Sequence, residues 1–239
     1  MKLTESSFRN LYHTFYIIVH DMKKYAGDEN GIKAPEGANA VLVYPYIDRQ
    51  AGFSFEVMAP ASWPSCEVFY DYALIQVQNR RLTIRSGAIE EFEGCRLGNQ
   101  DELRERFAKH CEMIDAYFST EGIESTRKVE LIDHLRHKDY PDDIEVALFA
   151  DDGSAEIVWM RLEGMGLDEE TGVHYLCGEL LNQPYGKYEA VMGDQMSILL
   201  TKDNEGVIRA FTRDTMILDP RGRKRLEEFR SRRGAENGS

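Results

Sequence analysis

The second half of the chain contains five short β-prone segments separated by turn signals, and this pattern limits the fold more than any other feature. The segments span residues 144–149, 155–163, 174–181, 196–200 and 207–211. Between them lie clusters of Gly, Pro, Asn and Asp, which favour tight turns. Short strands at this spacing predict a small antiparallel β-sheet or a partly closed barrel.

The first half is expected to combine helices with strands. Apolar residues from Phe8 to Met22 recur at spacings of three and four, which predicts an amphipathic helix. Four strands are expected next, at residues 40–47, 53–58, 66–77 and 82–85. A second helix is expected over about residues 101–118, with Asn99 and Glu102 as a capping box. The sequence thus predicts an α+β fold, in which an N-terminal helix–four-strand–helix unit precedes the β-rich part.

These patterns divide the chain into four parts. Residues 1–125 are expected to form an α+β domain, residues 126–141 a short helix and linker, and residues 142–218 a β-rich domain. Residues 219–239 form a basic C-terminal helix or tail. Leu226 and Phe229 favour a short amphipathic helix docked on the acidic body, and the alternative is a basic segment that binds an acidic partner or nucleic acid.

The charge of the chain is negative and unevenly placed. The formal net charge is -13, and residues 126–218 hold 9 Lys and Arg against 19 Asp and Glu, a net charge of -10. Such a surface repels phosphate backbones and anionic lipids. Nucleic acid and membranes are therefore disfavoured as partners, and a basic protein partner is favoured. The sequence leaves the oligomeric state open.

The spacing of the cysteines and the short length of the apolar runs favour a reducing cytoplasm as the compartment of the protein. The four cysteines are Cys66, Cys95, Cys111 and Cys177, and no CxxC spacing occurs. The N-terminus does not resemble a signal peptide, and the longest apolar run is far too short to span a membrane. Reduced thiols in a bacterial-type cytoplasm are the expectation.

No spacing matches an established catalytic or metal-binding motif. His134 and His137 lie on one predicted helix, but a metal site needs a third ligand and none is near in sequence. His174 and Cys177 are three residues apart on a predicted strand, so they point to opposite faces. Cys111 lies on the apolar side of a helix, where inert thiols are found. We therefore expect no cofactor and no metal. The sequence leaves enzymatic activity open and favours a protein without it.

One group of side chains is the candidate binding site. Trp159 and Arg161 share one face of the segment 155–163, and Tyr175 and Glu179 share one face of the segment 174–181. If the two strands pair, these residues meet, and Trp, Tyr and Arg are enriched at binding hot spots. The alternative is a buried Trp159 beside a cross-strand ion pair between Arg161 and Glu179.

Three pieces of the second half carry a family resemblance. They are residues 156–162 (EIVWMRL), 178–184 (GELLNQP) and 193–198 (GDQMSI). Over residues 142–212 the chain resembles the bacterial family called domain of unknown function 2314. That family has an acidic residue before a Trp-bearing strand, then a G-x-L-x-N-x-P strand end and a G-D-x-V strand start. Met196 stands here where Val is more usual. The resemblance implies a fold more than a function, because the family brings no established activity.

Two functions follow as hypotheses. The first is an acidic protein-binding module, such as an immunity-like or regulatory protein that covers a basic partner. The second is an enzyme or small-ligand binder with a site between the two halves, because domain junctions often hold pockets.

Overall fold

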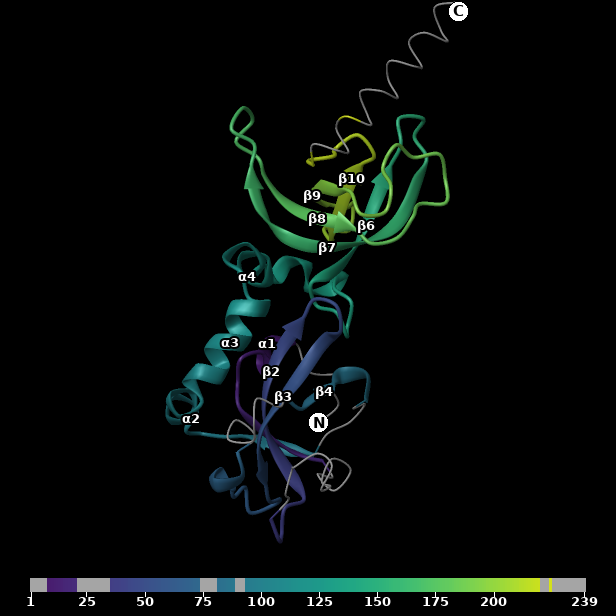
Figure 1. The fold of residues 1–239 in the computed structure, drawn as a ribbon. Helices are drawn as coiled ribbons and strands as arrows, with labels where there is room; N and C mark the ends of the chain where they lie inside the picture. Colours follow the sequence, from purple (N-terminus) through teal and green to yellow (C-terminus); the bar gives the residue numbers. More distant parts are fainter. Residues whose placement is uncertain (1–7, 21–34, 74–80, 89–92, 220–223, 225–239) are drawn as a thin grey trace, which may run out of the picture. The chain divides into compact units, whose positions relative to one another are not determined.

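The protein is described here by a computed structural model, which defines residues 8–20, 35–73, 81–88, 93–219 and 224 (Figure 1). The chain divides into two compact units. Unit 1 comprises residues 1–119 and 138–141, and unit 2 comprises residues 120–137 and 142–239. Both units combine helices with strands, so the expected α+β class is confirmed.

Unit 1 is built on a five-stranded antiparallel sheet with the order β4-β3-β2-β1-β5. The strands are β1 (Tyr16–Val19), β2 (Ala40–Asp48), β3 (Gly52–Ala61), β4 (Thr83–Arg85) and β5 (Gly94–Arg96). Alternation along β2 sends Val41 and Val43 into one apolar cluster and Leu42 and Tyr44 into another. The central strands are therefore buried on both faces.

Helices pack on both faces of this sheet, α2 and α3 on one face and α1 on the other. The helical segments of unit 1 are α1 (Phe8–Leu11), η3 (Tyr70–Tyr72), η5 (Ser86–Ala88), α2 (Gln100–Arg106) and α3 (Ala108–Phe118). Leu103, Phe107 and Ile114 pack into the cluster that contains Leu42. The single helix expected over residues 101–118 is interrupted at Phe107. Asn99 makes no side-chain cap to the backbone, contrary to the predicted capping box.

The helix predicted from Phe8 to Met22 is wrong over residues 12–20, and residues 21 and 22 lie outside the described residues. His13 adopts a φ of 55°, and strand β1 follows at Tyr16. Ile17 and Ile18 point to opposite faces and both are fully buried, which requires a continuous apolar run. Such a run fits a helical period as well as a two-sided strand. The described residues of unit 1 therefore form five strands where four were expected.

The strand predicted over residues 66–77 is also wrong within its described part. Val68 forms only an isolated bridge with Ala61, and residues 70–72 form a short 3-10 helix. Residues 74–77 lie outside the described residues.

Unit 2 contains a closed five-stranded barrel with the order β10-β6-β7-β8-β9. Its strands are β6 (Asp143–Phe149), β7 (Ala155–Leu167), β8 (His174–Leu180), β9 (Gln195–Lys202) and β10 (Ile208–Arg213). All neighbours are antiparallel except β10 and β6, whose parallel register pairs Phe211 with Ala147. The five expected strands form, and the barrel is closed where a sheet or a partly closed barrel was expected.

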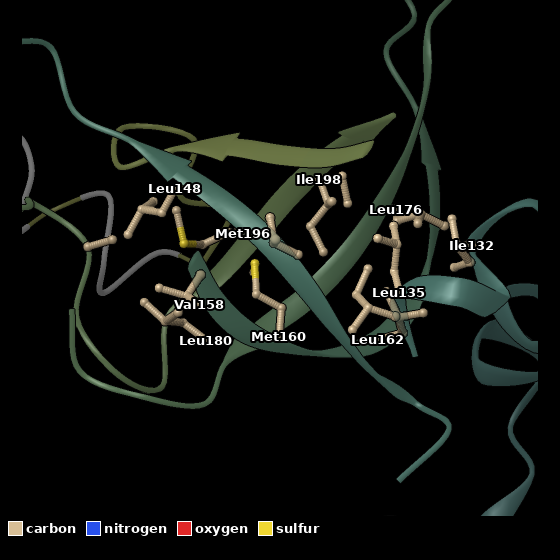
Figure 2. Packing of buried hydrophobic residues seen from close by; sticks show 14 of the residues in the cluster. Ile132, Leu135, Leu148, Val158, Met160, Leu162, Leu176, Leu180, Met196 and Ile198 are labelled. Atoms are coloured by element: carbon tan, nitrogen blue, oxygen red, sulfur yellow. The ribbon is translucent and has the colours of Figure 1, made fainter. Parts of the chain in front are cut away.

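Alternation along the strands fills the interior of the barrel. Val158, Met160 and Leu162 of β7 are fully buried, as are Met196 and Ile198 of β9. Figure 2 shows these side chains converging between the strands. The outward face of β7 is consequently the one that carries Trp159 and Arg161.

Two short helices precede the barrel, α4 (Glu121–Arg127) and η6 (Glu130–Leu135). Ile132 and Leu135 of η6 belong to the barrel core and lie at one end of it (Figure 2). Arg127 anchors α4 through two hydrogen bonds to Asp142, 2.9 and 2.7 Å long, and each side chain is 2% exposed. The expected linker is thus divided, because residues 126–137 belong to unit 2 and residues 138–141 to unit 1. Most of the basic tail lies outside the described residues.

Candidate functional site

The four predicted binding residues lie on the outer face of the barrel. The inward positions of β7 and β8 hold apolar residues such as Met160 and Leu180. Trp159 and Arg161 on β7, and Tyr175 and Glu179 on β8, occupy the alternate positions and are half-buried. Trp159 and Arg161 thus share one face of β7, and Tyr175 and Glu179 share one face of β8, as the alternation predicted.

Arg161 has a partner that the sequence did not indicate. In the strand register it lies opposite Glu179 on β8 and opposite Asp143 on β6. Its guanidinium donates from Nε to Asp143 Oδ1 (2.7 Å) and from Nη2 to Asp143 Oδ2 (2.8 Å). These hydrogen bonds to Asp143 raise the pKa of Arg161 although burial opposes them. The two-point ion pair is therefore Arg161–Asp143, and Glu179 adds negative charge from the other side.

Trp159 is held at its backbone and at its ring. Its N–H donates to Asn182 Oδ1 at 2.8 Å. The ring of His137 meets the indole edge-on, with centroids 5.2 Å apart. In the register Trp159 lies opposite Glu145, which is exposed. The indole is thus a fixed, partly accessible apolar surface.

Tyr175 lies apart from the other three predicted residues. It pairs with Gly166, four positions along β8 from Glu179, which corresponds to roughly 13 Å. A Cβ at Gly166 would come within 2.4 Å of the Tyr175 ring, so glycine is what allows the ring to lie on β7. The structure therefore brings together Trp159, Arg161 and Glu179, and places Tyr175 at a different surface.

That surface is a groove of about 640 Å³ beside the β7–β8 hairpin, which we call the hairpin groove. The hairpin projects beyond the other strands of the barrel (Figure 1). The apolar residues of the groove are Leu167, Val173, Tyr175, Leu199, Met216 and Leu218. Its charged residues are Asp168, Glu169 and Glu170, so every charge that lines it is negative.

A second groove, of about 650 Å³, lies over β6 and β10. Phe149 and Phe211 meet edge-on in it at 6.5 Å, and Ile157 is 62% exposed. Its charges are mixed, because Arg209 and Arg213 line it together with acidic residues. The second groove therefore lacks the uniformly negative charge of the hairpin groove.

Part of the acidity of unit 2 is used within the unit. Asp142, Asp143 and Asp203 pair with arginines. Asp152 and Asp168 accept hydrogen bonds from the backbone of their own turns. Glu169 and Glu170, in the turn of the β7–β8 hairpin, are exposed and so remain accessible to a partner.

Unit 1 holds a buried polar network that the sequence reasoning missed. Glu56, on strand β3 next to the central strand β2, is fully buried. Its Oε1 accepts from His110 Nε2 and Arg81 Nε, and its Oε2 accepts from Arg81 Nη2 and Thr83 Oγ1, each at 3.0 Å. Burial raises the pKa of Glu56, but the hydrogen bonds from His110 and Arg81 outweigh burial and lower it. Four donors saturate the carboxylate, so it acts as a structural anion. A glutamate at an inward position of an apolar strand was the available signal.

A second polar network lies on the same face of the sheet. The Tyr44 hydroxyl accepts from Arg104 Nη1 at 2.6 Å and donates to Asp115 Oδ1 at 3.2 Å. His13 Nε2 lies 3.1 Å from the same Asp115 oxygen. Burial raises the pKa of Tyr44 and raises that of the adjacent Cys111 to about 12, so both stay protonated at neutral pH. Neither side chain is an activated nucleophile.

The histidines considered as ligands have other roles. His134 Nε2 lies 2.8 Å from the carbonyl oxygen of Ile208, and His137 contacts Trp159. Among the described residues no group of three or more His, Cys, Asp and Glu side chains is arranged to hold a metal ion.

Comparison of the chain with protein-family models, with curated proteins and with solved structures finds no match in any of the three. Within the described residues, no helix has the length and apolar character needed to cross a membrane.

Proposed function

We propose that this chain is a protein-binding module that holds a basic, apolar-anchored segment of a partner protein in the hairpin groove. One observation carries the proposal. The groove is lined mainly by apolar side chains, and all of its charged lining residues are acidic. A complementary segment needs apolar side chains to contact the first group and Lys or Arg to pair with the second.

The exposed apolar side chains give such a segment its binding energy. Leu167 and Val173 are 50% and 46% exposed, so a partner removes their remaining apolar surface from water. That removal is worth roughly 25 cal/mol per Å². The carboxylates attract a basic segment over about 10 Å at 0.1 M salt and orient its approach. A hydrogen bond from the Thr171 hydroxyl lowers the pKa of Asp168, which keeps that carboxylate charged.

The same charge argument supports the other parts of the proposal. An immunity-like or regulatory module that covers a basic effector fits a groove of this sign, whereas nucleic acid and anionic lipid do not. Four cysteines without a disulfide fit a reducing cytoplasm. We also propose kinship with the domain of unknown function 2314 family for residues 142–212, on the residues of β7, β8 and β9 that carry the resemblance.

Three synthetic peptides test the proposal. Each is an amphipathic 16-residue peptide with Leu and Phe anchors, and the remaining positions are basic, neutral or acidic. We expect fluorescence anisotropy to show at least roughly tenfold tighter binding of the basic peptide than of the neutral one, weakened by added salt. The acidic peptide should not bind.

Paired variants locate the binding site. Val173→Asp places a charge among the apolar lining residues of the hairpin groove, and Ile157→Asp places the same charge in the second groove as a control. Glu169→Lys with Glu170→Lys reverses the charge of two acidic lining residues. Asp151→Lys with Glu205→Lys makes the same change of net charge in exposed turns elsewhere. The proposal predicts at least tenfold weaker binding for the groove variants only, and equal loss in both sets would refute it.

A further inference from the structure

Two cysteines of unit 1 lie in direct contact. The Sγ atoms of Cys66 and Cys95 are 3.0 Å apart, and both side chains are partly accessible to solvent. A disulfide bond has a length of about 2.05 Å, so an approach of about 1 Å would form it. We infer that Cys66 and Cys95 are a reversible dithiol, which a peroxide converts to an intramolecular disulfide.

The surrounding backbone already holds the two sulfurs in place. Cys66 lies in the loop after β3, which is closed by a hydrogen bond from Ser62 N–H to the Glu67 carbonyl at 2.9 Å. Within this loop, the Trp63 indole Nε1 donates to Glu93 Oε1 at 3.0 Å. Glu93 directly precedes β5, the strand that carries Cys95. The loop and the strand are therefore linked beside the thiols before any oxidation.

A second contact fixes the loop from the other side. Trp63 N–H donates to Asn39 Oδ1 at 2.7 Å, and Asn39 Nδ2 donates to the Trp63 carbonyl at 2.9 Å. Asn39 directly precedes strand β2 of the same sheet. Because the loop is tied to both β2 and β5, closing the disulfide requires little movement of the backbone.

The chemistry needs one peroxide molecule. The Cys66 thiolate attacks a peroxide oxygen, the O–O bond breaks, and Cys66 becomes a sulfenic acid while water leaves after protonation. The Cys95 sulfur then attacks the Cys66 sulfur, the S–O bond breaks, and a second water leaves with the Cys95 proton. In sum, two thiols and hydrogen peroxide give one disulfide and two waters.

The environments of the four cysteines support this order and this pairing. Burial and the neighbouring Cys66 sulfur raise the pKa of Cys95 to about 11, so Cys95 keeps its proton until the second step. Cys111 is 1% exposed and its thiol has a pKa of about 12. Cys177 belongs to the other unit, where burial raises its pKa.

The disulfide changes the edge of the sheet. Strand β5 has three residues, and within the part of the chain that the structure describes it pairs only with β1. The new bond joins positions 29 residues apart and ties β5 to the loop after β3. Openings that expose the β5 amides should therefore become rarer in the oxidised protein.

Peptide mapping of the full chain tests the inference. The reduced protein is treated with hydrogen peroxide, blocked with iodoacetamide and digested without reductant. We expect a linked pair of peptides that contains Cys66 and Cys95, lost again after dithiothreitol. Hydrogen exchange of the Cys95 amide, which faces its register partner Ile17 on β1, should slow about tenfold or more upon oxidation.

Three variants test the roles of the single thiols. Cys95→Ser should leave a Cys66 sulfenic acid that dimedone traps. Cys66→Ser should slow peroxide consumption about tenfold, because the remaining Cys95 thiol is protonated and a protonated thiol reacts poorly. Cys177→Ser, a half-buried cysteine in the other unit, should behave as the wild type. No linked peptide, a link between two chains, or a link through Cys111 or Cys177 would each overturn the inference.

Discussion

Replacing Glu56 by Gln tests whether the buried network in unit 1 stabilises the fold. The four donors around Glu56 aim at two carboxylate oxygens, whereas an amide offers one oxygen and one NH2 group. Two hydrogen bonds, one of them charge-assisted by Arg81, are therefore lost. Such bonds are worth about 1.5–3 kcal/mol each, and Arg81 is 34% exposed, so water offsets part of the loss. We expect unit 1 to lose about 3 kcal/mol of unfolding free energy.

Tryptophan fluorescence can measure this loss in one unit. The chain has two tryptophans, Trp63 in unit 1 and Trp159 in unit 2, so Trp159→Phe leaves a reporter of unit 1 alone. With a urea dependence of about 1.5 kcal/mol per M, the midpoint should fall by about 2 M. Glu112→Gln, an exposed change on α3, should alter stability by less than about 0.5 kcal/mol.

The pH dependence of the same variant gives a second test. The folded-state pKa of Glu56 is lowered from its ordinary value of 4.5. The stability that its charge contributes is therefore fully present above that value, and it is lost as the pH falls through the folded-state pKa. The difference between the wild type and Glu56→Gln should shrink below pH 4.5. Equal urea midpoints for Glu56→Gln and Glu112→Gln at pH 7, or a difference that grows in acid, would refute the reasoning.

Three further outcomes are expected. Asp142→Asn removes one acceptor from the Arg127 guanidinium, which is 2% exposed, and should lower the unfolding free energy of unit 2 by about 3–5 kcal/mol. Trp159 fluorescence in a Trp63→Phe background measures this loss, and Asp151→Asn, an exposed control, should have almost no effect. Closing the proposed disulfide of unit 1 should raise its unfolding free energy by about 3.5 kcal/mol in the chain-entropy account, and an unchanged Trp63 midpoint would contradict this. Cys111 should be the last cysteine to react with iodoacetamide at pH 8, because burial raises its pKa to about 12; mass spectrometry of partly alkylated chains checks the order.

The barrel strands could be predicted because apolar residues that face the barrel interior alternate along them with residues that face outward. Alternation along β7 correctly separated Met160 from Trp159 and Arg161. The same reasoning failed where a strand is buried on both faces. Tyr16 to Ile18 form an unbroken apolar run, which a helical period fits equally well.

The candidate site could be predicted only within single strands. A period of two places Trp159 and Arg161 on one face of β7, whereas the Asp143 partner of Arg161 depends on the β6–β7 register, which the sequence does not encode locally. Tyr175 was placed with the others because the length of the β7–β8 hairpin was not known. The hairpin groove also needs Met216 and Leu218, which follow the last strand.

The path of the chain determines which fragments can fold. Asp139, in a four-residue return to unit 1, accepts a hydrogen bond from Phe53 N–H at 2.7 Å, so a fragment ending at residue 119 leaves that donor unpaired. A fragment that begins at residue 142 keeps all five barrel strands. It lacks Ile132 and Leu135 from the core and the only arginine that pairs with buried Asp142 among the described residues. No single cut therefore leaves both units complete, because a cut after residue 119 removes residues 138–141 from unit 1 and a cut after residue 141 removes residues 120–137 from unit 2.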